Sequence, residues 1–305
     1  MRMKKSVFVT LSLAITLIFS SSVFAVPRSD SNSKEVLAAE AKAAKLSLAA
    51  KHANKFDPKL TNEERDKRSK DIEREIAKMV AGRQSKVNIS KSLEKMNVFV
   101  LDTPELEPAL VPMSAGSDIT MSNVIISYDS VSARWNVTGG GYWANTNWVN
   151  DLPSFFGSWV GTIKNVGEPD TVGVTYYNVS GTVPPVVSSL GYFTDHNGWV
   201  VESTSPSHGN GGLGVAFDFQ DKAKLVAANP GVYVYHGDGF AASVTYGSSF
   251  SSYSGYARSF YGHTWNSTGI SSVTFGGSGS TYGVSINFSS TSNRFPAYSG
   301  ADTVF

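Results

Sequence analysis

The sequence predicts a mostly β protein, in which an antiparallel β-sandwich or barrel-like C-terminal domain follows a charged, α-helical N-terminal segment. Charged residues fill 32 of the 93 positions in residues 26–118 but only 16 of the 187 positions in residues 119–305. Every Trp and Tyr lies after residue 127, where short stretches alternate between apolar and polar residues. Such alternation is typical of strands that bury one face and expose the other.

The N-terminus has the composition of a secretory signal peptide, which we assign to residues 1–25. Three basic residues precede an apolar stretch at residues 7–19, and a small-x-small pattern ends at Ala25. The apolar stretch is shorter than the roughly 20 residues that a membrane-spanning helix needs. We therefore expect a secreted, extracellular protein with no membrane span after signal removal. The absence of cysteine excludes disulfides and fits a bacterial exported protein.

Residues 26–100 are predicted to form a charged helical segment, which a hydrolase precursor could use as a prosegment. Residues 34–53 are rich in strong helix formers. Thr61 and Glu64 have the spacing of a capping box and predict the start of a second helix. A third, short helix is expected at residues 90–96. The apolar residues of the second helix form only a narrow stripe, namely Ile72, Ile76, Met79 and Val80. Because such a stripe buries little, we expect the segment to lie outside the interior of the β-domain.

Residues 101–118 are a predicted linker, because three prolines and a Ser-Ala-Gly-Ser run fall within them. Residues 119–305 are the predicted antiparallel β-domain. One-sided alternation favours antiparallel pairing, and clusters of Gly, Asn, Asp and Ser separate the strands as turns require. Roughly ten or more strands fit a sandwich or barrel. The expected strands are residues 119–128, 131–138, 158–164, 171–179, 213–220, 232–236, 241–246, 256–260, 271–275 and 282–288.

The candidate catalytic residues are His208, His236 and Asp238. His236 and Asp238 are two positions apart and would share one face of a continuing strand, as a His–Asp couple or a metal pair. Their Gly-rich context fits a hairpin turn as well. His208 opens a glycine-rich loop that could hold a substrate or connect two strands, and His196 beside Asp195 is a further candidate. We predict no metal site and no cofactor, because the motifs that would indicate them are absent.

The candidate ligand-binding residues are Tyr142, Trp143, Asn145 and Trp148, in a stretch expected to form a loop or sheet edge. An exposed aromatic ring can pack on the C–H face of a sugar, while an amide bonds the hydroxyl groups around it. The alternative is that these rings fill the core.

These features together favour a non-enzymatic extracellular binding module for a glycan or a cell-surface polymer. The formal net charge of +1 indicates neither nucleic acid nor membrane as a partner. One alternative is a secreted hydrolase made as a proform, with residues 26–113 as prosegment. A second is a secreted pore-forming protein, since residues 240–288 are rich in Ser, Gly, Thr and Tyr and nearly uncharged.

Overall fold

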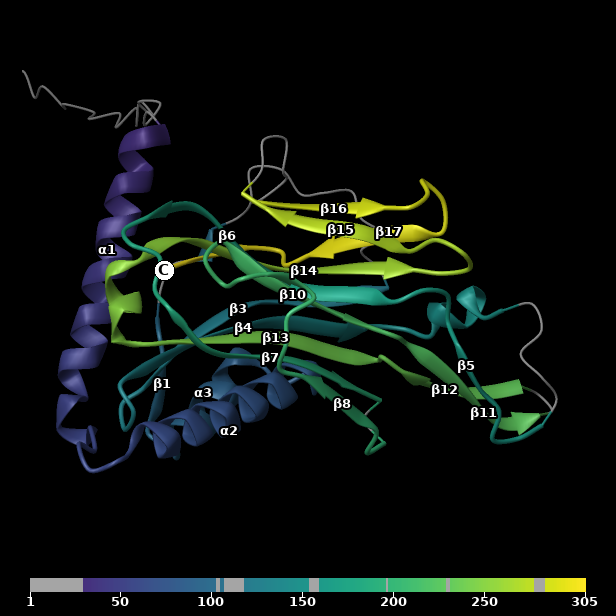
Figure 1. Cartoon of the computed structure of the whole chain (residues 1–305), viewed down its shortest axis with the longest axis horizontal. Helices are drawn as coiled ribbons and strands as arrows, with labels where there is room; N and C mark the ends of the chain where they lie inside the picture. The colour runs from purple at the N-terminus through teal and green to yellow at the C-terminus, as the bar shows by residue number, and fades with distance from the viewer. Residues whose placement is uncertain are drawn as a thin grey trace, which may run out of the picture.

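The computed structural model describes residues 30–102, 105–106, 118–153, 159–195, 197–228, 231–276 and 283–305. Two antiparallel sheets pack face to face, with helices on one outer face and a β-hairpin on the other (Figure 1). This arrangement confirms the predicted class of an antiparallel, mostly β fold behind a helical segment. The predicted signal peptide and the three prolines of the predicted linker lie outside the described residues.

The two sheets of the sandwich are called sheet A and sheet B. Sheet A has the strand order β1-β3-β4-β13-β7-β8, and sheet B has the order β2-β18-β14-β6-β10-β9 with β17 paired to β14. The strands of sheet A are β1 (Val98–Val100), β3 (Ile119–Asp129), β4 (Arg134–Trp143), β13 (Gly239–Tyr246), β7 (Val186–Thr194) and β8 (Val200–Ser203). Those of sheet B are β2 (Glu105–Leu106), β18 (Asp302–Val304), β14 (Ser254–Thr264), β6 (Asp170–Ser180), β10 (Gly214–Phe219), β9 (His208–Gly209) and β17 (Arg294–Tyr298).

Two smaller sheets complete the β structure. A three-stranded sheet of order β12-β11-β5 extends from one end of the sandwich and is called the projecting sheet (Figure 1). A two-stranded hairpin, β15–β16, covers the outer face of sheet B. Their bounds are β5 (Ile163–Asn165), β11 (Lys222–Ala228), β12 (Gly231–His236), β15 (Ile270–Phe275) and β16 (Val284–Phe288).

The core between the sheets is largely aromatic. Phe240 of sheet A stacks on Tyr261 of sheet B with ring centroids 4.0 Å apart, and Phe193 stacks on Phe219 at 3.7 Å. Burying a side chain of this size stabilises a fold by roughly 1.5–3 kcal/mol. The aromatic residues concentrated after residue 127 therefore supply the interior that holds the two sheets together.

The helical segment comprises α1 (Asp30–Lys51), α2 (Asn62–Ala81) and α3 (Lys86–Glu94). The predicted capping box is present at the start of α2. The Glu64 backbone N–H donates to Thr61 Oγ1 at 3.2 Å, and the Thr61 backbone N–H donates to Glu64 Oε2 at 2.8 Å. Helix α3 begins four residues before the predicted third helix, because Ser85 caps it by accepting from the Asn88 backbone N–H.

The expectation that this segment lies outside the interior is wrong. Ile72 and Ile76 are fully buried and share a core with residues of sheet A. The outer face of β13 carries the small side chains of Ala241, Ser243 and Thr245, so α2 can approach the sheet closely. A narrow apolar stripe is sufficient here because the sheet supplies the rest of the apolar surface. Strand β1 also pairs directly with β3, which ties the helical segment to sheet A.

The predicted one-sided alternation fails for the central strands. Strands β13 and β14 are buried along their whole length, and β4 and β10 are buried at all but two and one of their positions. Helix α2 covers the outer face of β13, and the β15–β16 hairpin packs on β14 through Phe260, Val273 and Val284. Much of the Ser- and Tyr-rich stretch that suggested membrane hairpins therefore lies in the middle layers of the sandwich. Within the described residues, each helix is either too short or too polar to cross a lipid bilayer.

Candidate functional site

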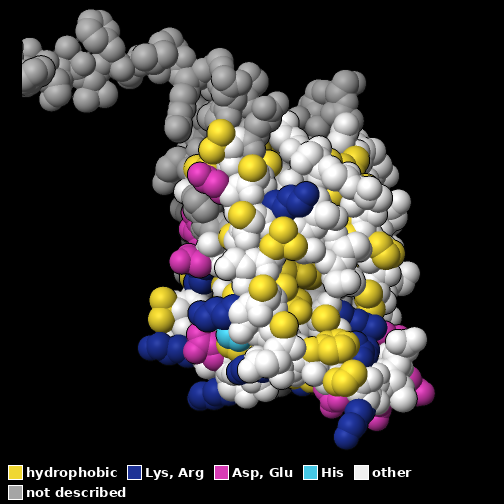
Figure 2. Space-filling view, turned by 90° about the vertical axis from the view of Figure 1, so that its left-hand side faces the viewer, with side chains coloured by type: hydrophobic (Ala, Val, Ile, Leu, Met, Phe, Trp, Pro, Cys, Tyr) yellow, Lys and Arg dark blue, Asp and Glu magenta, His cyan; other side chains and the backbone are white. Residues whose placement is uncertain are grey.

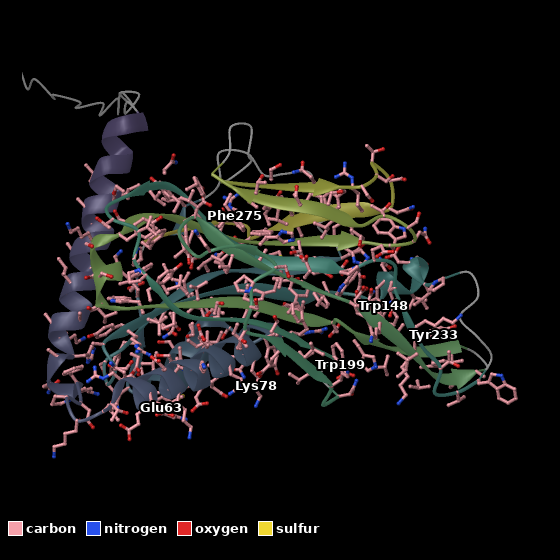
Figure 3. The ribbon with its side chains drawn as sticks, viewed as in Figure 1. Glu63, Lys78, Trp148, Trp199, Tyr233 and Phe275 are labelled. Atoms are coloured by element: carbon pink, nitrogen blue, oxygen red, sulfur yellow. The ribbon has the colours of Figure 1, made fainter. Side chains whose placement is uncertain are left out.

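A groove of about 370 Å³ lies where the projecting sheet meets the β7–β8 turn. Figure 3 shows Trp199 at this junction, with Trp148 and Tyr233 close to the same end of the sandwich. The groove combines an aromatic ring, an amide, charged groups and aliphatic side chains. Its lining residues are Ile163, Asp195, Asn197, Trp199, Lys224, Val226, Val234 and His236.

The projecting sheet presents one face to the groove and the other to the sandwich. Lys224 pairs with Ile163 on one side and with Val234 on the other, so these three form one row on the groove face. Successive residues point to opposite faces, and Leu225 and Tyr235 accordingly lie buried on the inner face. The inner face therefore anchors the sheet, while the outer face lines the groove.

The β7–β8 turn fixes the position of Trp199. Asp195 Oδ1 accepts hydrogen bonds from the backbone N–H groups of Asn197 at 2.8 Å and Trp199 at 3.0 Å. This is an Asx turn, in which a side-chain carboxylate replaces a backbone carbonyl. The turn is closed further by the Asn197 amide, which donates to the Asp195 carbonyl at 3.1 Å.

Asp195 also connects the turn to the projecting sheet. Its Oδ2 lies 2.8 Å from His236 Nδ1, although the two groups are not aligned as a hydrogen bond. The His236 ring lies 4.8 Å from the Trp199 ring, centroid to centroid, at an angle of 38°. Asp195, His236 and Trp199 thus form one connected unit in the groove wall.

Exposed apolar side chains continue from the groove along the projecting sheet and the loop before β5. Trp159 is 81% exposed. Four valines and isoleucines nearby are also exposed, namely Val160, Ile163, Val226 and Val232. A contiguous patch of exposed apolar side chains often marks an interaction surface, because soluble proteins rarely leave such a patch in contact with water.

The structure does not bring His236 and Asp238 together. Gly237 has a φ of 154°, which only glycine adopts readily, and the chain turns there between β12 and β13. Asp238 Oδ2 instead accepts a hydrogen bond from Arg83 Nη2 at 2.8 Å. The carboxylate beside His236 is that of Asp195, which lies in the other histidine motif noted in the sequence.

His208 pairs with Asp218, whose Oδ2 lies 2.9 Å from His208 Nε2. The glycine-rich loop that follows His208 lines a second cleft, of about 830 Å³. No charged side chain is among the described residues that line this cleft, and most of them are aliphatic, proline or glycine. His196, the remaining candidate, lies outside the described residues.

The expected exposure of Trp143 and Trp148 is wrong, because these side chains are only 1% and 5% exposed. Trp148 folds back within a 3₁₀ turn and stacks on Tyr235 at 4.8 Å, beneath the projecting sheet. Trp143 packs edge-on against the His263 ring at 4.9 Å.

The other two predicted ligand-binding residues also contact protein groups. The Arg83 guanidinium lies over the half-buried Tyr142 ring, 4.8 Å from its centroid. Asn145 donates from Nδ2 to Asp118 Oδ1 at 2.7 Å. Trp199 was not singled out by sequence, because Asp-His-Asn-Gly before it has the composition of an ordinary turn. The sequence feature that could have identified Trp199 is an Asx-turn sequence followed directly by tryptophan.

A buried ionisable cluster lies elsewhere, between β6, β14 and the residues just before β11. Oxygens of Asp170 and Asp221 and a nitrogen of His263 lie within 4.8 Å of one another. His263 Nδ1 is 2.9 Å from Asp170 Oδ2, and its Nε2 is 3.3 Å from Asp151 Oδ2. Asp221 accepts from the Tyr235 hydroxyl at 2.7 Å. This residue set could ligate a cation, but every one of these atoms already has a protein partner.

The electrostatics of the cluster follow from its burial. Burial, reinforced by the charge of Asp170, raises the pKa of Asp221 well above its usual range. Burial lowers the pKa of His263, but the charge of Asp170 and the contacts with Asp151 and Asp170 outweigh it and raise that pKa to about 10. His263 is therefore a buried cation among carboxylates. Since Asp170, Asp221 and His263 are fully buried, we interpret the cluster as an anchor of the fold.

No family model matches the chain, and no curated protein matches it.

Proposed function

We propose that this protein is an exported, non-enzymatic binding module, and that the groove at Trp199 binds a glycan of a cell surface or an extracellular polymer. The observation that carries the proposal is the Trp199 side chain, which the hydrogen bond of its backbone to Asp195 holds in the wall of a groove that also offers hydrogen-bonding groups. Sugar rings have apolar C–H faces and hydroxyl edges, so a site for them needs both kinds of contact.

The polar groups of the groove are arranged around this ring. Asn197 of the β7–β8 turn and Lys224 of the projecting sheet offer donors, and His236 adds a second ring to the groove wall. The exposed side chains of Ile163 and Val226 extend the contact surface beyond the groove. An open groove that continues into an apolar surface suits a polymer, which must enter from the side and extend past the site.

The first prediction concerns Trp199. Trp199→Ala is expected to weaken binding to the preferred glycan at least about tenfold, because buried aromatic anchors dominate contacts of this kind. Binding is measured with the purified wild-type protein and the variant on a glycan array and by pull-down on bacterial cell walls. Trp199→Phe keeps an aromatic face and should retain part of the affinity.

Val87→Ala is the control, because Val87 is an exposed apolar residue of α3, which packs on β1 at the edge of sheet A opposite β8. It should leave the affinity within about twofold of wild type. Absence of binding to any glycan or cell wall contradicts the proposed function. Loss of binding in Val87→Ala together with full binding in Trp199→Ala contradicts the assignment of the groove.

A secreted hydrolase is the second candidate, and the specific observation in its favour is that Asp195 and His236 meet in the same groove. A histidine beside a carboxylate can act as a general base on water. The described lining residues include no Ser or Thr hydroxyl that could serve as nucleophile. Release of shortened products by wild type, abolished in His236→Asn, would favour this candidate over a binding module.

A further inference from the structure

The opposite end of the sandwich is crossed by α1, which stands upright at the left of Figure 1. Ala41 and Lys45, one helical turn apart, are the two described residues of α1 that are fully buried. Ala41 packs against Tyr256 and Val304 of sheet B. Figure 2 shows the outer surface of this end, where Lys and Arg side chains are interspersed with acidic and apolar ones. The buried Lys45 side chain therefore does not belong to a basic patch on this surface.

The Lys45 side chain enters the end of the sandwich and places its ammonium group among backbone oxygens. Nζ donates to the Phe250 carbonyl at 3.1 Å and to the Tyr253 carbonyl. These carbonyls belong to the end of η3 (Ser248–Ser252), a 3₁₀ turn, and to the residue after it. The Phe250 carbonyl also accepts from the Tyr253 backbone N–H at 3.1 Å, which closes the turn, so the ammonium group is a second donor to it. Burial and the charge of Lys42 lower the pKa of Lys45 to about 7, and the two carbonyls supply the hydrogen bonds that a buried ammonium group needs.

Two aromatic rings complete the site. Nζ lies 4.7 Å from the centroid of the Phe250 ring and 5.2 Å from that of Phe305, both within the range of cation–π attraction. The two rings stack on each other with centroids 5.4 Å apart. Phe305 is fixed by two backbone hydrogen bonds with Gly255, at 2.8 and 2.9 Å. The rings and carbonyls of the site thus belong to the β-domain, whereas the ammonium group belongs to α1.

We propose that this end of the β-domain is a binding site for a primary ammonium group on an unbranched alkyl chain, and that Lys45 fills it as an internal ligand. The site has the parts that recognise a compact cation, namely two converging carbonyl oxygens and two ring faces. The alkyl stem of Lys45 spans the distance from the helix surface to these groups. Helix α1 thereby keeps other lysine-type side chains out of the pocket, and the site is independent of the groove at Trp199.

Removal of the side chain should leave a vacancy that a small amine can fill. Lys45→Ala deletes three methylene groups and the ammonium, which together match n-propylammonium. We expect Lys45→Ala to lower the melting temperature by roughly 5 °C, because it removes a buried side chain together with its hydrogen bonds. Propylammonium at ten times its Kd should restore about 3 °C. Tetramethylammonium chloride at the same concentration should restore none, because it cannot donate hydrogen bonds.

Lys42→Ala is the matched control, since Lys42 is exposed on the same helix. It should shift the melting temperature by less than about 1 °C and respond equally to the two salts. If propylammonium does not stabilise Lys45→Ala more than tetramethylammonium does, or if it stabilises Lys42→Ala as much, the proposed site is wrong.

A second variant covers the case in which Lys45→Ala does not fold. The chain contains no cysteine, so Lys45→Cys can be alkylated selectively in denaturant and then refolded. Aminoethylation rebuilds a lysine-like ammonium, whereas S-propylation adds a neutral chain of similar length. The aminoethylated protein should regain the wild-type melting temperature within about 2 °C, and the S-propylated protein should not. Equal recovery by both would show that only the alkyl stem matters, and would overturn the proposal.

Discussion

Replacing His263 with alanine is expected to lower the free energy of unfolding by about 3–5 kcal/mol. The substitution removes the cation between Asp170 and Asp151 and leaves the fully buried Asp170 without its charged partner. Deleting one member of a buried ion pair costs this much because the remaining charge stays desolvated. Chemical denaturation of wild type and variant at pH 6 measures the difference directly.

The pH dependence of this difference has a definite sign. The pKa of His263 is raised above its ordinary value of 6.5 to about 10, so the folded protein holds this proton more tightly than the unfolded chain does. The stabilisation is therefore fully present below pH 6.5 and is lost as the pH rises toward 10. The difference in the free energy of unfolding between wild type and His263→Ala should therefore decrease as the pH rises from 6.5 to 10.

His208→Ala is the control for His263→Ala. His208 also pairs with a carboxylate, but its side chain and that of Asp218 are partly exposed. Pairs of this kind contribute about 0–1 kcal/mol. A loss of similar size in both variants, or a loss below about 1 kcal/mol in His263→Ala, would contradict the role of the cluster as an anchor.

The second large effect is expected at Glu73, on the face of α2 that packs against sheet A. Its carboxyl group is buried and accepts from the Thr245 hydroxyl at 2.8 Å and the Ser188 hydroxyl at 2.9 Å. Burial raises its pKa to about 7, although these hydrogen bonds act in the opposite direction. The Thr245 hydroxyl also lies 2.6 Å from Asn136 Oδ1. A protonated Glu73 can donate to Thr245, which leaves the Thr245 proton for Asn136.

The raised pKa means that folding favours the neutral carboxyl group. The folded state binds more protons than the unfolded state between pH 4.5 and 7, so stability falls as the pH rises through that window. Glu73→Gln keeps the side-chain shape and cannot ionise. Relative to this variant, wild type should lose about 2–3 kcal/mol between pH 5 and pH 8.

The measurement is the free energy of unfolding of both proteins across that range, because their difference isolates Glu73 from other titrating groups. Glu63→Gln serves as control, since Glu63 is an exposed residue of the same helix (Figure 3). That variant should track wild type at every pH. A constant gap between wild type and Glu73→Gln would show that Glu73 is not held in the interior between α2 and sheet A.

The fold class could be predicted from sequence because its signals are local. The capping box at Thr61 and the apolar–polar alternation in residues 131–138, 213–220 and 282–288 depend only on neighbouring residues. Which element covers the outer face of a sheet depends on residues that are far apart in the sequence. The sequence of α2 shows a narrow stripe, but it does not show that the outer face of β13 is small enough to receive it.

The candidate site was harder to predict for the same reason. Asp195 and His236 lie in two motifs that are far apart in the sequence. The pairing of β7 with β13, which sets Thr194 opposite Gly239, brings them together. Trp148 and Trp199 have similar polar neighbours in the sequence. Their opposite environments arise because a 3₁₀ turn folds one under the projecting sheet, while an Asx turn holds the other in the groove.

Hydrogen–deuterium exchange of the wild-type protein tests the central claim most directly, with and without the glycan that the array identifies. Ligand binding slows exchange where it orders the backbone and excludes water. We expect slower exchange in residues 197–203 and 222–228, which contribute to the groove. Slower exchange in residues 183–186 and 209–214 instead, along the larger aliphatic cleft, would contradict the assignment of the groove as the binding site.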